Sequence, residues 1–399
     1  MNWQARVTEI KDLKQARKIL AELGCDESGR RIMAEKAVFK TVKLEQIPAK
    51  AANLLKQTFL AKGGEVAVNR GTADLSVEFS DVLICATLKQ YRQALSQLKM
   101  QPWGLPAIAQ TVENVLNYNS GFERRIYKWR NCSLTVAPNR TLIMGILNLT
   151  PDSFSDGGKF NNPDTALKQV EKMVKDGADI IDVGAESTRP YNGKQEIPAA
   201  EEMERLLPIL KEILANFSLP VSVDTYKAAV AREALQLGAH IINDVWGLQG
   251  DRDMAAVVAE YQGPVVIMHN QRGTNYERDI MSHIIDFLQT SINQGLNQGI
   301  NRDNFIIDPG IGFGKTAAQN LVVMSRLAEL KSLGCPILLG TSRKRFIGDV
   351  LNQPVDERVE GTIATVGQGI MNGVNIVRVH DVKAVARAAK MSDAMIGEE

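Results

Sequence analysis

The chain has 399 residues, which exceeds the usual size of a single domain and predicts two domains. Its composition, with 44% hydrophobic residues, is that of a globular protein with a large core. Lys and Arg number 47 against 46 Asp and Glu, so no net charge attracts nucleic acid or an anionic membrane, and any anion site must be local.

The four cysteines, Cys25, Cys85, Cys132 and Cys335, are scattered and include no Cys-x-x-Cys pair. This spacing argues against a zinc site and against a disulfide framework, and it is typical of a reducing compartment. The N-terminal segment has no apolar targeting region, and no later run approaches the length of a membrane span. We therefore expect a cytoplasmic protein that has neither a membrane nor a nucleic acid as partner.

The first 121 residues have an α/β pattern of their own. Helices are predicted over 11–23, 49–61 and 88–99, and strands over 38–44, 65–68 and 82–85. The region contains no phosphate-binding loop, metal-ligand spacing or catalytic pair. We expect a module that stabilises the protein or supports its assembly. The alternative is a regulatory ligand site at the Gly-containing turn 62–65.

From residue 126 onward, short apolar runs alternate with amphipathic helical segments. The eight runs are 142–147, 180–183, 220–223, 241–242, 265–268, 305–307, 336–339 and 375–379. The alternation predicts right-handed βαβ units and a parallel sheet, and eight units in roughly 250 residues match a (β/α)₈ barrel. A doubly wound open sheet is the alternative, but it usually has fewer strands. We predict an α/β protein with a TIM barrel over 126–399, preceded by a smaller α/β domain over 1–121.

A polar or charged residue follows every one of these runs. In chain order they are Asn148, Asp182 with Glu186, Asp224, Asn243 with Asp244, His269 with Asn270, Asp308, Ser342 to Lys344, and Arg378 with His380. In a closed barrel the carboxyl ends of the strands meet at one rim, where burying so many polar groups without a ligand is costly. One or two could cap helices, as Asp224 before the next helix, but eight predict an active site.

The residue types predict a rim with two halves. Carboxylates and amides, at Asp182, Asp224, Asn243 and Asp308, would accept hydrogen bonds from a heterocycle rich in N–H groups. Cations follow the last two strands, and the loops after strands seven and eight recurrently bind phosphate in this barrel. We therefore expect an acidic half that binds a heterocycle and a cationic half that binds phosphate.

Two other signals are discounted. Residues 310–316 resemble a P-loop, but Pro309 occupies the position of the first Gly, so we expect a mobile βα loop that brings Phe313 to a flat ligand. His240 and His283 are expected to be structural. No His pair has zinc-binding spacing, so a metal held by protein ligands alone is not expected.

Seven segments together resemble the dihydropteroate synthases. They are MGILNLTPDSFSDGG (144–158), DVGAESTRP (182–190), SVDTYK (222–227), INDV (242–245), DPGIGFGK (308–315), GTSRKRFIG (340–348) and RVHDV (378–382). The resemblance covers roughly residues 126–399, in order. It implies condensation of (7,8-dihydropterin-6-yl)methyl diphosphate with p-aminobenzoate, releasing pyrophosphate in folate synthesis. It also implies sulfonamides as competitors, Mg²⁺ as cofactor and a homodimer.

The resemblance assigns roles residue by residue. The pterin would be bound by Asp224, Asn243, Met268, Asp308 and Lys344. The pyrophosphate would be bound by Asn148, Asp182, Arg189, Arg378 and His380, with Mg²⁺ at Asn148. The p-aminobenzoate pocket would comprise Thr188, Pro190, Phe313, Ser342 and Lys344. The residues expected to be catalytic are Asp182, Asp308, Lys344, Arg378 and His380. Residues 150–159 and 186–194 resemble mobile loops that close over the substrates.

The implied chemistry suits these residue types. Breaking the C–O bond leaves positive charge on the pterin methylene and negative charge on the pyrophosphate, so carboxylates suit the first and Arg, His and Mg²⁺ the second. An aromatic amine is neutral at pH 7 and needs no strong base. One alternative is a pterin-dependent methyltransferase barrel, which needs no pyrophosphate site; the cations at 342–345 and 378–380 weigh against it. The other is a catalytically silent pterin-binding protein, which would have lost the rim charges.

Overall fold

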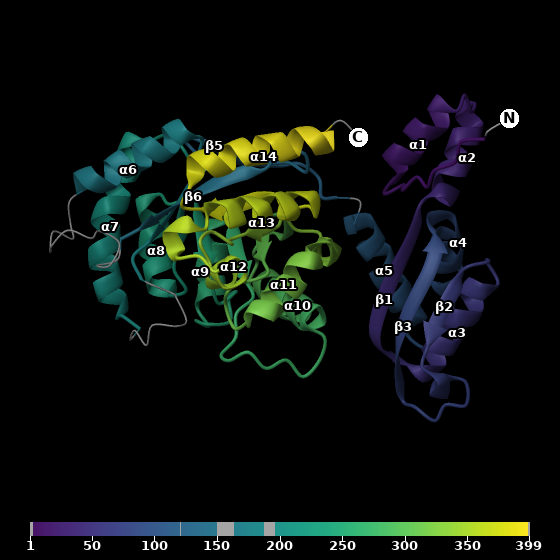
Figure 1. Cartoon of the computed structure of the whole chain (residues 1–399). Coiled ribbons are helices and arrows are strands. Elements are labelled where there is room, and N and C mark those ends of the chain that lie inside the picture. Colours follow the sequence, from purple (N-terminus) through teal and green to yellow (C-terminus); the bar gives the residue numbers. More distant parts are fainter. Residues whose placement is uncertain (1–2, 120, 150–162, 187–195, 398–399) are drawn as a thin grey trace. The chain divides into compact units, whose positions relative to one another are not determined.

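Figure 1 shows the computed structural model of the chain, which describes residues 3–119, 121–149, 163–186 and 196–397. The chain divides into two compact units, Met1–Ser120 and Gly121–Glu399. The first predicted lid, 150–159, lies outside the described residues. So does all of the second except Glu186, and with it Thr188, Arg189 and Pro190.

The first unit, purple to blue in Figure 1, is built on an antiparallel sheet in the order β1 (Phe39–Pro48), β3 (Phe79–Thr87) and β2 (Glu65–Val68). Alternate side chains of β1 and β3 are buried, so the sheet has one apolar face. That face packs on residues of α3 (Ala49–Leu60), α4 (Leu88–Leu98) and α5 (Leu105–Asn119).

The predicted helices and strands of this unit are present, but two helices were not expected. They are α2 (Glu27–Ala37), which packs on α1 (Leu13–Glu22), and α5. The sequence of α2 is polar, and only one of its residues, Ala34, is buried. Its hydrophobic periodicity was therefore too weak to predict a helix.

The turn at residues 62–65 is explained by packing. Gly63 has φ +77°, and its carbonyl accepts a hydrogen bond from Gln90 Nε2 at 2.7 Å. A Cβ on Gly64 would lie 3.2 Å from Ala86 Cβ. The two glycines therefore allow α3 to join β2 tightly, and the geometry offers no support for a regulatory ligand site there.

Eight parallel strands form the sheet of the second unit, in the order β11-β10-β9-β8-β7-β6-β13-β12. A parallel bridge between Ile307 and Ile337 closes it into a barrel, which confirms the predicted fold and rules out an open sheet. The strands are β6 (Leu142–Asn148), β7 (Ile180–Gly184), β8 (Val221–Asp224), β9 (Ile241–Asp244), β10 (Val265–Met268), β11 (Phe305–Asp308), β12 (Leu338–Leu339) and β13 (Ile376–Val379).

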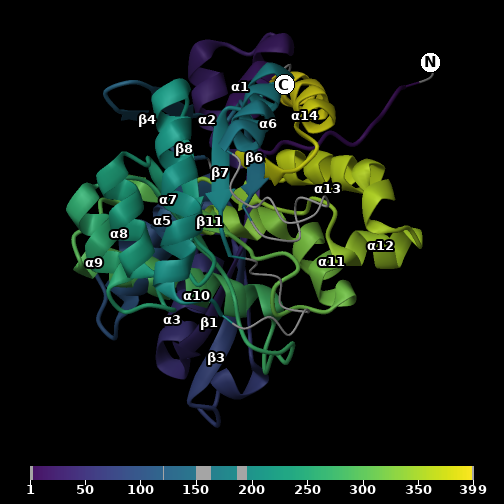
Figure 2. The ribbon, with the colours of Figure 1, turned by 90° about the vertical axis from the view of Figure 1, so that its left-hand side faces the viewer.

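Helices surround these strands, with α7, α8 and α9 on one side of Figure 2 and α11, α12 and α13 on the other. They are α6 (Pro163–Asp176), α7 (Ala199–Asn216), α8 (Ala228–Leu237), α9 (Met254–Tyr261), α10 (Ile280–Asn297), α11 (Ala317–Ser325), α12 (Arg345–Leu351), α13 (Val359–Met371) and α14 (Val382–Gly397). After β11, helix α11 is followed by a 3₁₀ segment, Leu327–Leu333. No described helix is long and apolar enough to cross a membrane.

The strands bury both faces, and the two faces contact different groups. Side chains such as Ile181, Val183 and Ile267 pack in the core that also contains the helices. The alternate side chains form a separate apolar cluster that includes Ile180 and Ile306. Because strand side chains alternate, the residues two positions later, Asp182 and Asp308 in these strands, share the inner face. The barrel interior therefore changes from apolar to polar along each strand.

A β-hairpin closes the apolar end of the barrel and was not predicted. Its strands are β4 (Arg125–Lys128) and β5 (Ser133–Val136), and Leu134 and Val136 join the inner cluster. Its hydrophobic pattern is short, and docking against the barrel decides its structure.

Candidate active site

The polar rim residues come together because four strands end in register. Asn148 pairs with Gly184, Gly184 with Asp224, and Asp224 with Asn243. A Cβ on Gly184 would lie 3.3 Å from the Cβ of Asp224, so a glycine at this position leaves room for the carboxylate. The strand ends thus place an amide, a carboxylate and a second amide side by side.

Arg378 lies between two carboxylates. Its Nε donates to Asp182 Oδ2 at 2.6 Å, and its Nη2 donates to Asp224 Oδ2 at 2.7 Å. Asn243 Nδ2 also donates to Asp182 Oδ2, at 3.3 Å. The prediction of separate acidic and cationic halves was therefore wrong. The charges alternate, because a buried carboxylate pair needs a cation close by.

Three buried oxygens of this cluster have no hydrogen-bond partner in the part of the chain that the structure describes. They are Asp182 Oδ1, Asp224 Oδ1 and Ser222 Oγ. An unpaired buried acceptor is costly, so such groups mark places where a ligand can donate. Sequence reasoning missed Ser222. Its signal is a hydroxyl within a buried strand, in register with Asp182.

Burial raises the pKa of Asp224 to about 7, although Arg378 opposes the shift. Burial by itself would lower the pKa of Arg378, but Asp182 and Asp224 raise it above its usual value. Arg378 therefore stays charged, while Asp224 exchanges a proton near neutral pH.

Lys344 is the one cation of the 343–345 run that faces the described rim residues. Its Nζ donates to the carbonyl of Ile311 and lies 4.7 Å from the ring centre of Phe313. Burial lowers the pKa of Lys344 to about 8, and Asp308 opposes this shift. Arg343 instead pairs with Asp381 at 2.6 Å.

Arg345 is 71% exposed on α12 and lies 3.7 Å from Asp349. The run therefore supplies one partly buried cation to the rim. Lys344 is the N-cap residue of α12, so Arg343 precedes the helix and Arg345 is its first residue.

Asp308 and Met268 end neighbouring strands and pair in register. Asp308 Oδ1 accepts from the backbone N–H of Gly310 at 2.6 Å, which fixes the carboxylate at the start of the glycine-rich loop. Burial raises the pKa of Asp308, against the opposing charge of Lys344. Both predicted pterin contacts are buried at this end of the strands.

Ser342 and His380 bind one another, although they were predicted for different substrates. The backbone N–H of His380 donates to Ser342 Oγ at 3.1 Å, and Oγ lies 2.9 Å from His380 Nδ1. Either atom can donate in this contact, because Oγ has a second lone pair and the proton of a neutral imidazole can lie on Nδ1 or Nε2.

Two of the polar residues after the strands differ in whether they have a structural role. Asp224 does not cap α8, because the N–H of Ala228 donates to Asp251 Oδ2 at 2.9 Å. Asp244 accepts from the backbone N–H groups of Trp246 and Leu248 and so fixes a turn.

Three further polar residues, one of them Glu186 at the rim, make structural contacts. Glu186 pairs with Lys227 at 2.6 Å. His240 lies at the amino end of β9, where its Nδ1 accepts from Val221 N at 3.0 Å. His283 lies in α10 with its ring edge-on to His269, 5.4 Å between centres.

The glycine-rich loop after β11 is held by hydrogen bonds, contrary to the expectation of a mobile loop. The N–H of Gly312 donates to Asn320 Oδ1 at 2.7 Å, and Tyr276 OH donates to the carbonyl of Gly314 at 2.9 Å. Gly310 has φ +67°, and a Cβ there would lie 1.8 Å from the carbonyl oxygen of His269. The glycines thus serve close approach to the end of β10.

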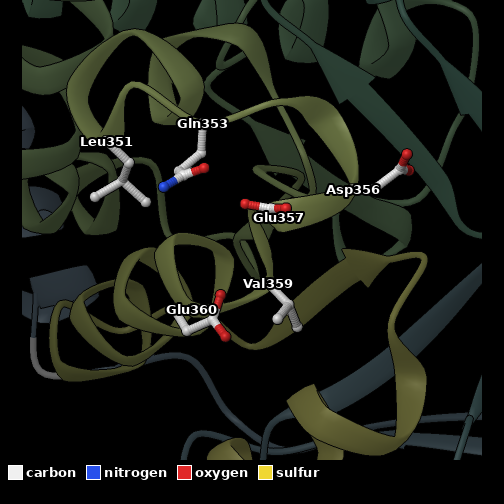
Figure 3. Close-up of a pocket in the computed structure, with 6 residues that line it drawn as sticks. All are labelled: Leu351, Gln353, Asp356, Glu357, Val359 and Glu360. Carbon is white, nitrogen blue, oxygen red and sulfur yellow. The ribbon is translucent and has the colours of Figure 1, made fainter.

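Figure 3 shows a different hollow, beside α12 and α13. It contains none of the predicted site residues; its lining residues are Leu351, Gln353, Asp356, Glu357, Val359 and Glu360. Three carboxylates without a lining cation would repel a pyrophosphate. This hollow is therefore not the substrate site.

The described residues fit Mg²⁺ only if the substrate supplies some of its ligands. They contain no group of three His, Cys, Asp or Glu side chains that could hold a metal ion. Asn148, half-buried at the end of β6, offers a neutral amide oxygen. Mg²⁺ commonly takes few protein ligands and completes its shell with substrate phosphate oxygens and water. The donor set fits that arrangement.

Residues 144–380 match the family described as pterin binding enzyme. The barrel, its polar rim and this match define the class: the chain belongs to the pterin binding enzyme family.

Two curated relatives carry the assignment further. The dihydropteroate synthase of Clostridium beijerinckii is 54% identical over 258 residues, which are 64% of this chain and 95% of the relative. A probable bifunctional folylpolyglutamate synthase/dihydropteroate synthase of Halobacterium salinarum is 35% identical over 393 residues, 97% of this chain and 46% of the relative. The chain thus falls among the dihydropteroate synthases, which are transferases of folate biosynthesis.

Solved structures agree. Clostridium difficile dihydropteroate synthase, determined with pteroic acid, is 54% identical with a TM-score of 0.63, covering 64% of this chain and 97% of that one. The Xanthomonas albilineans enzyme with 4-aminobenzoic acid is 36% identical, with a TM-score of 0.64 and coverage of 69% and 99%. The Yersinia pestis enzyme with a sulfonamide is 39% identical, with a TM-score of 0.64 and coverage of 68% and 100%.

Proposed function

We propose that the chain condenses (7,8-dihydropterin-6-yl)methyl diphosphate with p-aminobenzoate to give dihydropteroate and pyrophosphate. The observation that carries the proposal is the cluster of Asp182, Asp224 and Arg378, in which a partly buried cation is paired with two carboxylates that each keep an unpaired oxygen. A pterin supplies N–H donors for such acceptors, and a pyrophosphate needs the cation.

The pterin ring would be held by groups on four strands and at one helix terminus. Asp224 and Asp308 would accept from ring N–H groups, and Asn243 can both donate and accept. Lys344 would donate to a ring acceptor, which its position beside Asp308 favours. Met268 offers an apolar surface at the end of β10. Because these groups lie on rigid strands and a helix terminus, the ring would be oriented without loop ordering.

Charge stabilisation would then carry the bond exchange. As the bond from the methylene carbon to the pyrophosphate oxygen breaks, positive charge grows on the methylene and negative charge on the leaving group. Asp182 and Asp308 offset the first, while Arg378 and His380 stabilise the second. The bonds from Asp182 and Asp224 hold the guanidinium in place before reaction.

The amine of p-aminobenzoate attacks the methylene carbon with its own lone pair, and the nitrogen then loses one proton to the departing pyrophosphate or to water. The amine is neutral at pH 7, so the step requires orientation rather than a strong base. The ring of Phe313 lies beside the ammonium of Lys344. Phe313 would contact the aromatic ring of p-aminobenzoate, and Lys344 its carboxylate. Ser342, which is hydrogen-bonded to His380, would complete the pocket. Sulfonamides would compete for the same contacts. Thr188, Arg189 and Pro190 remain sequence-based assignments.

Mg²⁺ would be held by Asn148 together with oxygens of the pyrophosphate. When bound, it neutralises charge on the leaving group. Chelation by EDTA should abolish pyrophosphate release, and added Mg²⁺ should restore it. Unchanged turnover of EDTA-treated, metal-free protein would exclude this role.

Assembly as a homodimer is supported by one face of the barrel unit. Exposed large apolar side chains gather on α11, on α12 and at the two ends of the segment leading through α13; they are Leu321, Val322, Val350, Leu351, Val355 and Met371. Exposed apolar side chains on neighbouring helices are characteristic of interaction sites. Val350→Glu should reduce the mass measured by sedimentation to that of a monomer. Val174→Glu, an exposed apolar residue on α6, should not.

The location is proposed to be the cytoplasm. All four cysteines are free, which supports a reducing compartment. Cell fractionation would test this.

The test of the main proposal is release of pyrophosphate by the purified protein from both substrates with Mg²⁺. Formation of dihydropteroate, followed by chromatography, should match the pyrophosphate released. Release without p-aminobenzoate, or no release at saturating substrates, would overturn the proposal.

A further inference from the structure

Lys315 is a buried lysine to which neither the motifs nor the proposed reaction gives a role. Its side chain is 1% exposed, and it immediately precedes Thr316, the N-cap of α11. Its Nζ lies 2.8 Å from His269 Nδ1, 2.9 Å from the carbonyl of Gly310 and 3.1 Å from that of Phe313. Three acceptors match the three N–H groups of an ammonium.

The acceptors lie on two separate pieces of chain. Gly310 and Phe313 belong to the glycine-rich loop, whereas His269 follows β10, 46 residues earlier. Burial, followed by the charge of Lys315, lowers the pKa of His269 to about 2, so the imidazole is neutral and can accept at Nδ1. Lys315 therefore forms hydrogen bonds within the loop and also links the loop to the residue that follows β10.

The opposite side of the same loop contacts Lys344. The carbonyl of Ile311 accepts from Lys344 Nζ, and the ring of Phe313 lies 4.7 Å from it. A Cβ on Gly312 would lie 2.8 Å from Lys344 Cδ, so the loop backbone also packs against the lysine chain. The loop thus lies between the buried Lys315 and the partly buried Lys344.

We propose that Lys315 is a positioning residue for the transfer reaction, which acts by holding the 310–315 loop so that Ile311 and Phe313 place Lys344 for p-aminobenzoate. This inference rests on the proposed function of the site. A substrate would contact Lys344 and Phe313, while Lys315 is covered by the loop. Small displacements of such groups matter, since a 1 Å misplacement can cost about a hundredfold in rate.

Lys315→Met keeps the length and apolar stem of the side chain and removes its three donors. We expect KM for p-aminobenzoate to rise about tenfold and kcat to fall, with KM for the dihydropterin diphosphate changed less than about twofold. Arg232→Met, which removes an exposed cation on α8, is the matched control and should leave all three constants unchanged.

A double-mutant cycle separates positioning from a general loss of structure. If Lys315 acts through Lys344, the variant with both Lys315→Met and Lys344→Met should be no less active than Lys344→Met alone. Additive losses, or equal increases in both KM values, would overturn the inference. Retained affinity of Lys315→Met for a pterin without diphosphate, measured by calorimetry, shows that the strand-end site is folded.

A second measurement does not depend on turnover. Amide hydrogen exchange of residues 310–316 should be at least tenfold faster in Lys315→Met than in the wild type, with the peptides of β7 and β8 unchanged. Unchanged exchange in the loop would overturn the inference even if activity falls. If the wild-type protein releases no pyrophosphate, the proposed function fails, and the exchange result alone decides whether Lys315 holds the loop.

Discussion

Each end of the barrel interior contains an arginine, Arg125 buried and Arg378 partly buried, and the groups around the two are paired to different degrees. At the amino end, Arg125 donates to the carbonyls of Asp303, Phe305 and Gly334 at 2.8 to 3.1 Å. At the carboxyl end, Arg378 is paired with carboxylates that keep unpaired oxygens.

The difference separates stability from function. Three carbonyl acceptors hold Arg125, and the apolar cluster under the hairpin excludes water, so this end has little capacity for a ligand. At the other end, carboxylate oxygens lack hydrogen-bond donors. Burial there raises the pKa of Asp224 and lowers that of Lys344. Groups held in this way are characteristic of sites that bind and react.

The largest expected effect is on activity at the carboxyl end. Lys344→Met should lower kcat/KM by about 10²–10³-fold, as expected for loss of one preorganised charged donor, with little change in the free energy of unfolding. Pyrophosphate release and denaturant unfolding measure the two. Arg345→Met is the control, since this exposed neighbour should have no effect on either. A loss of stability that parallels the loss of activity would remove the distinction between the two ends.

At the amino end the order of effects should reverse. Arg125→Met leaves three carbonyls without their donor and should lower the free energy of unfolding by about 3 kcal/mol. The protein that remains folded should have kcat/KM within about twofold of the wild type. Lys128→Met, on the exposed side of the same strand, should change stability by less than about 0.5 kcal/mol. A tenfold fall in kcat/KM for Arg125→Met would mean that the two ends are coupled.

The pH dependence of activity tests the charges of the rim. Asp224, with its pKa raised from 3.8 to about 7, takes up a proton as the pH falls and loses an acceptor. Lys344, with its pKa lowered from 10.5 to about 8, loses its charge as the pH rises. The kcat/KM for the pterin substrate should therefore peak between pH 7 and 8 and fall about tenfold per unit on each side.

Lys344→Arg offers a check on the alkaline side of this profile. Because arginine stays protonated throughout the range, whatever activity this variant retains should no longer fall above pH 8. An alkaline limb that persists unchanged would assign it to another group.

The smallest effect is expected for a single hydrogen bond at the amino end. Tyr127 OH donates to the carbonyl of Asp303, and Tyr127→Phe should lower the free energy of unfolding by about 1 kcal/mol without affecting turnover. Denaturant unfolding of both proteins measures the difference. A change as large as that of Arg125→Met would show that the hairpin docks mainly through this tyrosine.

The relative from Halobacterium salinarum bears on the first unit. Its match spans 97% of this chain, so it extends through residues of the first unit as well as the barrel. The sequence of the first unit is therefore similar to that of at least one relative, although the family match itself covers residues 144–380. This pairing favours a role linked to the synthase over an unrelated module.

The sequence by itself determined the barrel and the identity of most rim residues. Along the inner face of each strand an apolar residue precedes a polar one by two positions, as in Ile180 and Asp182 or Ile376 and Arg378, and this spacing follows from the alternation of strand side chains. Buried strands that end in polar residues are a local signal, which is why eight strand positions could be predicted without a structure.

Only the tertiary structure decided which of these groups touch. Arg378 meets Asp182 and Asp224 across 196 and 154 residues of sequence, Ser342 meets His380, and Lys315 reaches His269. These pairs depend on closure of the barrel, which brings distant strand ends within hydrogen-bond distance. An unpaired charge is costly where the barrel buries it, so each buried charge at the strand ends is found beside a partner. Composition and periodicity contain no information about such distances.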